Sequence, residues 1–533
     1  MTTRQRWTLL ATIIGSGAVF LDGTIVNVAL PRIGRELPAT LVGVLEGQTY
    51  VVSGYLAVLA ALLILAGALS DRYGRRRVYS IGLAGFAITS GLCGIAPSLE
   101  VLIVSRLLQG AAGALMVPGG LSIITQTFDD TERGRAFGIW TAATSALALI
   151  GPVIGGLLVD TIGWRIAFLV NVPVLATALI ITRRHIEESR DLDPHRGFDW
   201  LGSVVAVVAV GGLSFGVIRG GEHAWRDPVA WVILAIGVVA LAVFPVLMAV
   251  RRDPLVPLGL FRSRAFSTIN LATFFIYGGL YVMLSYLSIL LQGSLGYSAL
   301  AAGAATLPMG LSLITLSTRV GTIAGRIGAR RFMTAGPLSM AAGLLWFARI
   351  PATSAPWHAA IDRPASLVPP IDFVIDVVPG ILLFGIGIAC VVAPLTSTLM
   401  GSVPGRFSGL ASAINNAIAR VGQPLLGAII FLAISATFYA TLGALAPGLD
   451  TNSDAVRAIY SPLNPPRGAA TPDQVAAAVR ASVEAFHLAM IVAASLLAVG
   501  SAVSWIGLRG SEPKRARESR EAHDSAVDHP AEA

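Results

Sequence analysis

The chain has 533 residues, of which 55% are hydrophobic and only 13% are charged. Soluble globular proteins carry about 25% charged residues, so the composition excludes a soluble fold and indicates a chain that lies mostly in lipid. The net charge of +8 does not indicate nucleic-acid binding, because the basic residues are spread over short loops between apolar segments. The two cysteines, Cys93 and Cys390, each lie inside an apolar segment, which favours neither a disulfide framework nor a metal site.

The chain contains fourteen apolar segments of membrane length, and a helix needs about 20 such residues to cross a bilayer. We therefore predict an all-α polytopic membrane protein with 14 transmembrane helices. With a cytoplasmic N-terminus, the inside loops hold 26 of the 38 Lys and Arg residues and the outside loops hold 10. This bias agrees with the positive-inside rule and places both termini in the cytoplasm. The predicted spans are 9–30, 48–69, 78–95, 101–124, 136–159, 166–181, 200–217, 229–250, 268–291, 299–318, 332–347, 377–399, 408–436 and 487–507.

The first span contains an aspartate in the segment DGTIVNVALP, which begins at Asp22. A carboxylate near the middle of a membrane helix costs about 2.5–3.5 kcal/mol on insertion scales, so it usually faces a cavity or a partner. Asp22 is the only acid well inside the first six predicted spans. We therefore predict that it is a proton-carrying site, with a purely structural polar contact as the alternative.

A repeated motif divides the chain into two halves. GALSDRYGRRR, which begins at Gly67, recurs as GTIAGRIGARR from Gly321, each time after the second span of its half. The two copies are further apart than six helices require, so spans seven and eight read as an insert, and two such halves are typical of transporters. The predicted units are an N-terminal six-helix half (1–190), a two-helix insert (191–260) and a C-terminal six-helix half (261–510) with an outside loop (437–484). A disordered cytoplasmic tail follows (511–533).

The first copy of this motif is a candidate conformational latch at the cytoplasmic end of its helix. Asp71 can pair with Arg75 or Arg76, or with the N-terminus of a neighbouring helix, and the alternative is a basic loop that only sets topology. The second copy has Gly325 in place of the acid, so only the first copy can use a carboxylate. The candidate latch residues of this motif are Gly67, Asp71, Arg72, Gly74, Arg75 and Arg76.

The fourth and fifth spans carry two further candidates. Arg106 lies inside the fourth span, where it would favour the ionised form of Asp22 if the two approached each other. The alternative is an arginine that anchors the outer end of its helix. The fifth span contains GPVIGG, a small-residue face with a proline bend that suits close helix packing and a pliable gate. Its candidate gating residues are Gly151, Pro152, Gly155 and Gly156.

The thirteenth span has a polar stripe on one helical face. Asn416, Arg420 and Gln423 recur at helical spacing, and polar residues inside a membrane helix should point into the bundle. We assign these three residues, together with Asn27 of the first span, to a candidate substrate cavity. Bridging contacts between helices are the equal alternative.

After the thirteenth span, a proline-rich segment separates the last two helices. Its end reads TPDQVAAAV, in which Thr471, Pro472 and Gln474 form a helix start.

The chain resembles the major facilitator superfamily, and within it the fourteen-helix branch of the drug:proton antiporters. The resemblance rests on DGTIVNVALP, GALSDRYGRRR and GPVIGG, and on four further segments. Tyr50 stands where the family usually has tryptophan. The further segments are SRLLQGAAGA from Ser105, GWRIAFLVNVP from Gly163, FDWLG from Phe198 and PLVPLGLFRSRAF from Pro254.

The resemblance implies proton-driven export of lipophilic compounds by alternating access, with Asp22 and Arg106 in proton coupling and Gly151–Gly156 as the antiporter motif. It implies a multi-pass protein of the cell membrane, with protons, lipid and a small lipophilic molecule as partners. We expect a monomer that needs no cofactor beyond the proton gradient and binds no nucleic acid or metal.

Three alternatives remain. One is an importer with the same fold, because the fold does not fix the direction of transport. The second is a dedicated exporter of a single endogenous metabolite, antibiotic or lipid, which a transporter sequence does not distinguish from a multidrug exporter. The third is a membrane enzyme or sensor, but no Ser/His/Asp or metal-ligand constellation is visible. No GxxxxGK[ST] loop for ATP is present either.

Overall fold

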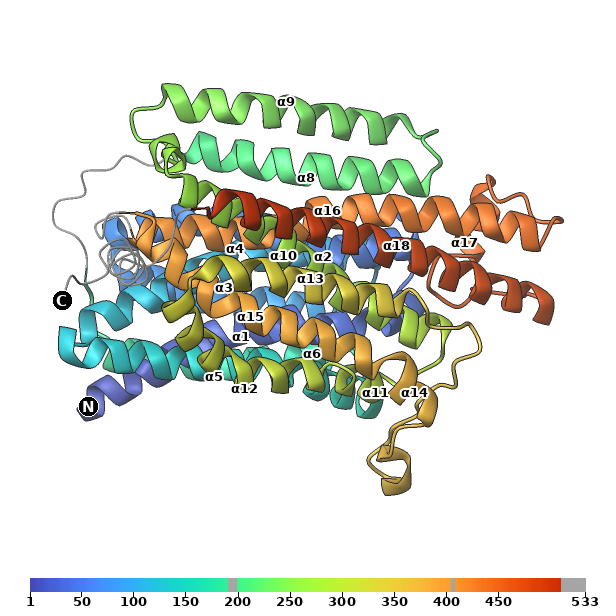
Figure 1. Cartoon of the computed structure of the whole chain (residues 1–533), viewed down its shortest axis with the longest axis horizontal. Coiled ribbons are helices and arrows are strands. Elements are labelled where there is room, and N and C mark those ends of the chain that lie inside the picture. Colours follow the sequence, from blue (N-terminus) through green and yellow to red (C-terminus); the bar gives the residue numbers. More distant parts are fainter. Residues whose placement is uncertain (190–198, 404–407, 510–533) are drawn as a thin grey trace, which may run out of the picture.

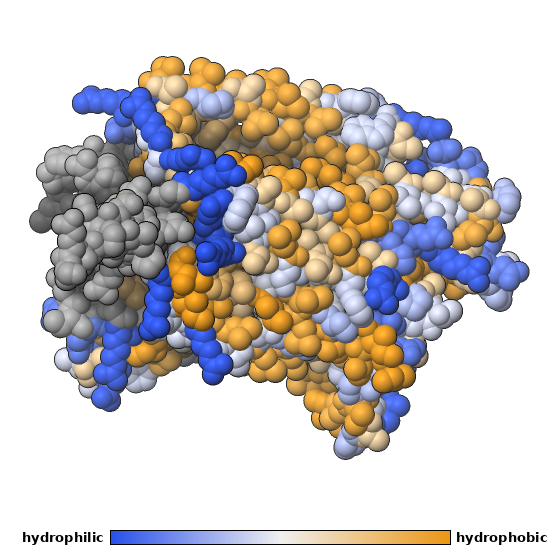
Figure 2. Space-filling model, in the orientation of Figure 1, coloured by the Kyte–Doolittle hydropathy of each residue, from blue (hydrophilic) through white to orange (hydrophobic). Residues whose placement is uncertain are grey.

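The computed structural model describes residues 1–189, 199–403 and 408–509. The described residues form helices joined by turns and loops and contain no strands, which confirms the predicted all-α class. Eleven of their helices are long and apolar enough to cross a membrane. Helices also occupy the other three predicted ranges, as α3, α5 and α13. Figure 2 shows hydrophobic residues over the middle of the visible face and hydrophilic residues towards its two ends, as expected for a protein surrounded by lipid.

The N-terminal half is a bundle in which α1 is central. It contacts α2, α4, α5 and α7 along its length. Thr2 begins the helix with a capping box, in which its side chain accepts from the backbone N–H of Gln5 and the Gln5 side chain accepts from that of Thr2. The helices of this half are α1 (Thr3–Glu36), α2 (Val44–Tyr73), α3 (Arg75–Gly94), α4 (Leu99–Thr127), α5 (Asp130–Thr161), α6 (Ile166–Leu169) and α7 (Asn171–His185).

The C-terminal half repeats this arrangement with more interruptions. The ninth predicted span ends in a π-helical turn, and the tenth is split into a short and a long helix. The helices of this half are η1 (Leu258–Arg262), α10 (Arg264–Ile289), η2 (Leu290–Ser294), α11 (Ala299–Ala304), α12 (Leu307–Ile327) and α13 (Ala329–Phe347). They continue with η3 (Pro364–Leu367), α14 (Ile371–Asp376), α15 (Val378–Gly401), α16 (Ser408–Leu445), α17 (Asp454–Ile459) and α18 (Pro472–Gly507).

The sequence repeat has a counterpart in the backbone. Gly74 and Gly328 occupy the same position in the two copies, and both have positive φ, +105° and +92°. Each glycine ends one helix and begins the next, a turn that residues with a Cβ rarely adopt. The repeat therefore preserves a tight turn between the second and third helices of each half.

The insert consists of α8 (Trp200–Glu222) and α9 (Pro228–Val250), which lie side by side on the outside of the bundle (Figure 1). α8 contacts α2 of the N-terminal half and α16 of the C-terminal half. α9 is the outer helix, with many of its large apolar side chains exposed.

We call the end of the molecule where α1 begins and α18 ends the proximal end, and the opposite end, which carries α11, α14 and α17, the distal end (Figure 1). The halves meet along α1 and α10, α2 and α16, and α5 and α11. Hydrogen bonds join them near the distal end. These bonds run from Gln292 Nε2 to the carbonyl of Val28 (3.0 Å), from Leu45 N to Ser461 Oγ (3.1 Å), from Gln48 Nε2 to Asn464 Oδ1 (3.0 Å) and from Arg467 Nη2 to the carbonyl of Leu37 (3.2 Å).

Two helix boundaries at the distal end differ from the prediction. α16 continues to Leu445 and α18 begins at Pro472, so the predicted loop 437–484 shrinks to residues 446–471 and contains α17. The capping box at Thr471 and Gln474 is present as predicted. The helix continues from this cap into the apolar segment without a break. The predicted tail, 511–533, and most of the predicted link from the N-terminal half to the insert lie outside the described residues.

Candidate functional site

The candidate proton site is a buried ion pair between α1 and α4. Asp22 and Arg106 are each 1% exposed, and Arg106 Nη1 lies 2.5 Å from Asp22 Oδ2. The sequence left open whether Arg106 reaches Asp22 or anchors the end of its helix, and the structure brings the two side chains together. Pairing is necessary here, because removing an isolated charge from water costs several kcal/mol or more.

Three neutral side chains complete the environment of Asp22. Gln109 Nε2 and Asn171 Nδ2 each donate to Asp22 Oδ1 at 3.2 Å, and both also donate to Ser90 Oγ. Arg106 Nη1 donates in addition to Gln109 Oε1 at 2.6 Å. Both carboxylate oxygens therefore have donors, as a stable buried anion requires.

Helices of the N-terminal half enclose the guanidinium of Arg106. Its Nε donates to the carbonyl of Val51 at 3.1 Å, and its Cζ lies 4.0 Å from the centre of the Tyr55 ring and 5.7 Å from that of Phe168. These contacts come from α2 and α6. A proton can therefore reach Asp22 only when the helices move or water enters between them.

The basic loop at the proximal end is organised by a residue that the sequence did not indicate. Both oxygens of Glu188 accept backbone hydrogen bonds at the start of α3, from Arg76 N and Arg77 N at 3.1 Å each. Arg76 Nε also lies 3.8 Å from Glu188 Oε2. A carboxylate at a helix N-terminus is stabilised by the helix dipole.

The remaining residues of the predicted latch are placed as follows. The backbone of Asp71 lies in α2, but its side chain lies outside what the structure describes, so its predicted pairing is not described. The Arg72 guanidinium lies 5.9 Å from the ring centre of Tyr73, and Arg75 N donates to the carbonyl of Ser189. Gly67 lies on α2 opposite Pro118 of α4.

The glycines of GPVIGG pack against both halves. A Cβ on Gly151 would collide with Thr24 of α1, and one on Gly156 would collide with the backbone carbonyl of Ala299. On the facing helix, a Cβ on Gly303 would collide with the carbonyl of Pro152. Small residues on both helices thus allow the backbones of α5 and α11 to approach closely, as predicted for this motif.

Asp160 follows this glycine face and fixes the distal end of α5 to α11. Its two oxygens accept from Ala299 N at 3.2 Å and Leu300 N at 2.7 Å. No sequence pattern indicates this contact, because a single aspartate at a helix end does not show its partner. Beside it lies a polar distal cavity of about 490 Å³, whose lining includes Arg32, Arg35 and Glu36.

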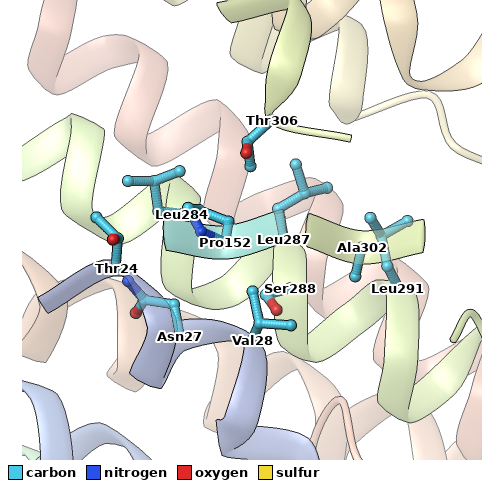
Figure 3. Close-up of a pocket in the computed structure, with 10 residues that line it drawn as sticks. All are labelled: Thr24, Asn27, Val28, Pro152, Leu284, Leu287, Ser288, Leu291, Ala302 and Thr306. Carbon is cyan, nitrogen blue, oxygen red and sulfur yellow. The ribbon is translucent and has the colours of Figure 1, made fainter. Parts of the chain in front are cut away.

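Asn27, assigned to the substrate cavity, lies at the interface of the halves. Its Oδ1 accepts from Ser285 Oγ of α10 at 2.8 Å, and it lines a cavity of about 20 Å³ (Figure 3). A water molecule needs roughly 10–15 Å³ of such space, so the cavity holds about one water molecule and no drug-sized compound. The other lining residues are Thr24, Val28, Pro152, Leu284, Leu287, Ser288, Leu291, Ala302 and Thr306.

The polar stripe of α16 contains one side chain that hydrogen-bonds within the helix and two that have buried atoms without a hydrogen-bond partner. Asn416 donates to the carbonyl of Ser412 on its own helix. Arg420 is 5% exposed, its Nε is without a hydrogen-bond partner, and its guanidinium lies 5.7 Å from the ring centre of Phe20 on α1. The Oε1 of Gln423 is also buried and without a partner. Arg420 and Gln423 therefore have unused hydrogen-bonding capacity close to the interface between the halves.

The second span begins earlier than predicted. α2 starts at Val44 and includes in its first turn Glu46, an acid whose side chain is fully buried. The predicted span began at Gln48 and so left Glu46 in a loop. Its place in the first turn of α2, after the N-cap Gly43, is the signal that could have identified it.

Comparison with known proteins identifies the family. The model of the Major Facilitator Superfamily matches residues 12–427, which run from within α1 through the insert to the middle of α16. The chain belongs to the major facilitator superfamily. It is therefore a multi-pass membrane transporter and not an enzyme.

Relatives within the superfamily align along most of the chain. The multidrug resistance protein Stp of Mycobacterium tuberculosis (strain CDC 1551 / Oshkosh) is 33% identical over 519 residues, which cover 95% of this chain and 92% of Stp. The methylenomycin A resistance protein of Bacillus subtilis is 33% identical and covers 82% of this chain and 89% of its own length.

Solved structures of other transporters share the fold at low identity. A bacterial homologue of the human lysosomal transporter Spinster, in an inward-facing and unoccupied conformation, aligns with a TM-score of 0.61 and 15% identity. The alignment covers 96% of this chain and 98% of that chain. In the described part of this member of the superfamily, no group of three or more His, Cys, Asp or Glu residues could hold a metal ion.

Proposed function

We propose that the chain is a proton-coupled antiporter that exports lipophilic or amphiphilic small molecules across the plasma membrane. The observation that carries this proposal is the buried pair of Asp22 and Arg106, because ionisable side chains inside a membrane bundle are costly and mark proton pathways. The names of the relatives, which refer to multidrug resistance and methylenomycin A resistance, support drug-like substrates. The energy source is the proton gradient, no cofactor takes part, and the chain acts as a monomer.

Proton uptake by Asp22 changes what holds α1 in place. A proton on Asp22 Oδ2 removes the charge of the carboxylate, and with it the ion pair to Arg106. Arg106 retains acceptors at Gln109 Oε1 and at the carbonyl of Val51. It therefore stays attached to α4 and α2 while α1 loses its charged contact. Since α1 also contacts α10 through Asn27, its movement alters the interface between the halves.

In alternating access, the two halves move so that the interface between them opens to one side of the membrane at a time, and the distal contacts close one of these sides. We assign fourteen spans, formed by α1 to α5, α6 with α7, α8, α9, α10, α11 with α12, α13, α15, α16 and α18. The proximal end, which carries the basic loops, faces the cytoplasm. The described conformation, with hydrogen bonds between the halves near the distal end, then corresponds to a state that is closed to the outside.

Arg420 gives the substrate region a positive charge. α11 and α12 contain no acid, and Arg420 is buried beside Phe20. We therefore expect neutral, zwitterionic or monocationic amphiphiles to be exported better than dications, which would be repelled. Efficient proton-driven export of a dicationic dye would contradict this expectation.

The test of proton coupling is transport by the variant Asp22→Asn in inverted membrane vesicles. Asparagine keeps the shape of the side chain but binds no proton in this pH range, so we expect export driven by a pH gradient to be lost. Exchange of labelled for unlabelled substrate without a gradient should persist, because it needs only substrate binding and movement of the halves. The matched control is Glu484→Gln, an exposed carboxylate on α18. Normal gradient-driven export by Asp22→Asn would refute the proposal.

The second candidate is a dedicated exporter of one metabolite, antibiotic or lipid. The relative named for resistance to a single compound, methylenomycin A, favours this narrower function. A panel of structurally unrelated neutral and monocationic drugs separates the two candidates. Export of several unrelated compounds supports a multidrug transporter, and export of a single chemical family supports a dedicated one.

A further inference from the structure

The insert joins the two halves of the transporter near the distal end of α8. On one side, Tyr50 Oη of α2 donates to the carbonyl of Phe215 in α8 at 2.8 Å. On the other side, Ser435 Oγ of α16 donates to the carbonyl of Gly221 at 3.2 Å. α8 therefore contacts both halves within about two helical turns.

Two buried carboxylates lie at this junction. Glu46 of α2 is 0% exposed and Glu222, the last residue of α8, is 3% exposed. Glu46 Oε2 accepts from Gly43 N at 2.8 Å, and Glu222 Oε1 lies so near Gly43 that an added Cβ would collide with it. Both carboxylates thus contact the same glycine. Glu46 Oε1 and Glu222 Oε2 are buried and have no hydrogen-bond partner.

The arginines at the junction are engaged elsewhere. Arg219 Nη1 lies 3.8 Å from Glu46 Oε1, but Arg219 Nε makes a much closer contact of 2.6 Å with Asp227 Oδ2. Arg457 of α17 donates through Nη1 to the backbone carbonyl of Glu222 and through Nε to that of Thr451. The described residues give the Glu222 carboxylate no ion pair within 4.0 Å.

The other titratable groups do not supply the missing charge. His223 Nε2 lies 3.9 Å from Glu46 Oε2 and has no hydrogen-bond partner. Burial lowers the pKa of His223, and Arg219 lowers it further, so its ring is neutral at pH 7. The groups that face the junction are Glu46 and Tyr50 from α2, Arg219 and Glu222 from α8, His223 and Asp227 from the turn that follows, Tyr439 from α16, and Asp454 and Arg457 from α17.

We propose that Glu46 and Glu222 form a proton-binding site at the distal end, separate from Asp22, and that a proton bound there holds the insert against both halves. Two buried carboxylates beside one residue cannot both be ionised without a large cost. A proton taken from water converts one carboxylate into a carboxylic acid. The new O–H group can donate to one of the unpartnered oxygens, and the repulsion between the two groups is removed. Loss of the proton to water restores the repulsion and loosens the distal contacts.

The role in transport rests on the proposed function, in which the distal end faces an acidic outside. Protonation from that side would then favour closure of the distal end after substrate has left. The two glutamates lie on α2 and α8, whereas Asp22 and Arg106 lie on α1 and α4. The two sites can therefore be tested independently.

The experiment measures the distal distance between the halves as a function of pH. Spin labels are attached to cysteines at Leu41 and Ala455, two exposed distal positions on opposite halves, in a protein without Cys93 and Cys390. Distance distributions are recorded by pulsed electron resonance in lipid nanodiscs between pH 5.5 and 8.5. We expect the unaltered junction to show a single short distance at low pH and a longer, broader distribution at high pH.

The variants decide whether the two glutamates cause this change. Glu46→Gln with Glu222→Gln should keep the short distance at every pH, because the amides cannot ionise. The exposed control Glu484→Gln should leave the pH response unchanged. Asp22→Asn removes the contribution of α1, so it should keep a pH response that is lost when the two glutamine substitutions are added to it. A distance that does not change with pH, or a full pH response in the double glutamine variant, would overturn the proposal. Melting curves of each variant identify misfolding, and loss of gradient-driven export in Asp22→Asn alone tests proton coupling separately.

Discussion

Arg106 compensates most of the cost of burying the Asp22 carboxylate. Its guanidinium reaches Asp22, Gln109 and the carbonyl of Val51 at once, and it lies against the ring of Tyr55. The fork of N–H donors suits this arrangement, which a lysine ammonium cannot reproduce. Arg106 therefore matters for stability as well as for the proposed proton coupling.

Removing this arginine should be more harmful than removing the whole pair. We expect Arg106→Ala to lower the stability of the folded protein by about 3–5 kcal/mol, because it leaves an unpaired buried carboxylate. Thermal unfolding in detergent, followed by tryptophan fluorescence, measures the change.

The double variant Asp22→Asn with Arg106→Gln is the control for this prediction. It keeps two neutral hydrogen-bonding groups of similar size in place of the charges, so it should unfold at a higher temperature than Arg106→Ala. If Arg106→Ala were as stable as the unaltered protein, the ion pair would not compensate a buried charge.

The sequence predicted the centre of this site but not its surroundings. Asp22 and Arg106 stand out because charges are rare inside apolar spans. Gln109 could have been predicted as a neighbour of the pair, since it lies one helical turn after Arg106 on the same face. Asn171 was not, because its position depends on the break between α6 and α7 at Val170, where the sequence showed one continuous apolar helix.

At the scale of elements, α5 and α11 form a close backbone contact between the halves. It depends on glycines on both helices and on Asp160, which caps α11. Side chains larger than hydrogen would separate the two backbones at this point. Closure of the distal end therefore requires that these positions keep glycine.

Gly303→Ala should disfavour the distally closed conformation. Its new Cβ meets the backbone carbonyl of Pro152, which cannot move away as a side chain could. Overpacking of this kind costs about 1–3 kcal/mol, so we expect the closed state to lose population and transport to slow. Spin labels at Leu41 and Ala455 report the population.

Gly325→Ala is the matched control on the adjoining helix α12, where an added Cβ meets nothing within 4 Å. It should leave the label distances unchanged and slightly stabilise the helix. Equal effects of the two substitutions would mean that the close approach of α5 and α11 is not required for closure.

Element boundaries were predictable where capping chemistry marks them and uncertain where apolar residues continue. Thr471 and Gln474 marked the start of α18 correctly. The end of α16 was placed too early, because the residues after position 436 mix polar, small and aromatic side chains and the sequence up to Leu445 contains no clear stop signal. At α2 the same uncertainty of a few residues hid Glu46 and with it the second buried acidic site.

At the scale of the whole molecule, the distal contacts between the halves imply that solutes reach the interface between the halves more easily from the proximal end than from the distal end. If the proximal end is cytoplasmic, the interface near Asn416 should be reachable from the cytoplasm and closed to the outside. Asn416 is partly exposed, although it lies within the bundle.

A cysteine at Asn416 should therefore react with a membrane-impermeant maleimide in inverted vesicles and react at least about tenfold more slowly in intact cells. The factor of ten corresponds to about 1.4 kcal/mol in favour of the closed distal end. The background lacks Cys93 and Cys390. A cysteine at Leu41, which is 69% exposed in a distal loop, should show the opposite preference. Faster labelling of position 416 from outside the cell would contradict both the orientation and the assigned conformation.

The two faces of α1 have a consequence for how this transporter evolves. A helix turns by about 100° per residue, so Phe20, Thr24 and Asn27 lie opposite Asp22 on α1. Asp22 is held by the N-terminal half, whereas Phe20 faces Arg420 and Asn27 binds Ser285 in the C-terminal half. Substitutions on the second face can change which compounds fit without altering the proposed proton site at Asp22. Selection by a new drug should therefore collect its mutations on that face and on the facing side of α16, and leave the residues around Asp22 unchanged.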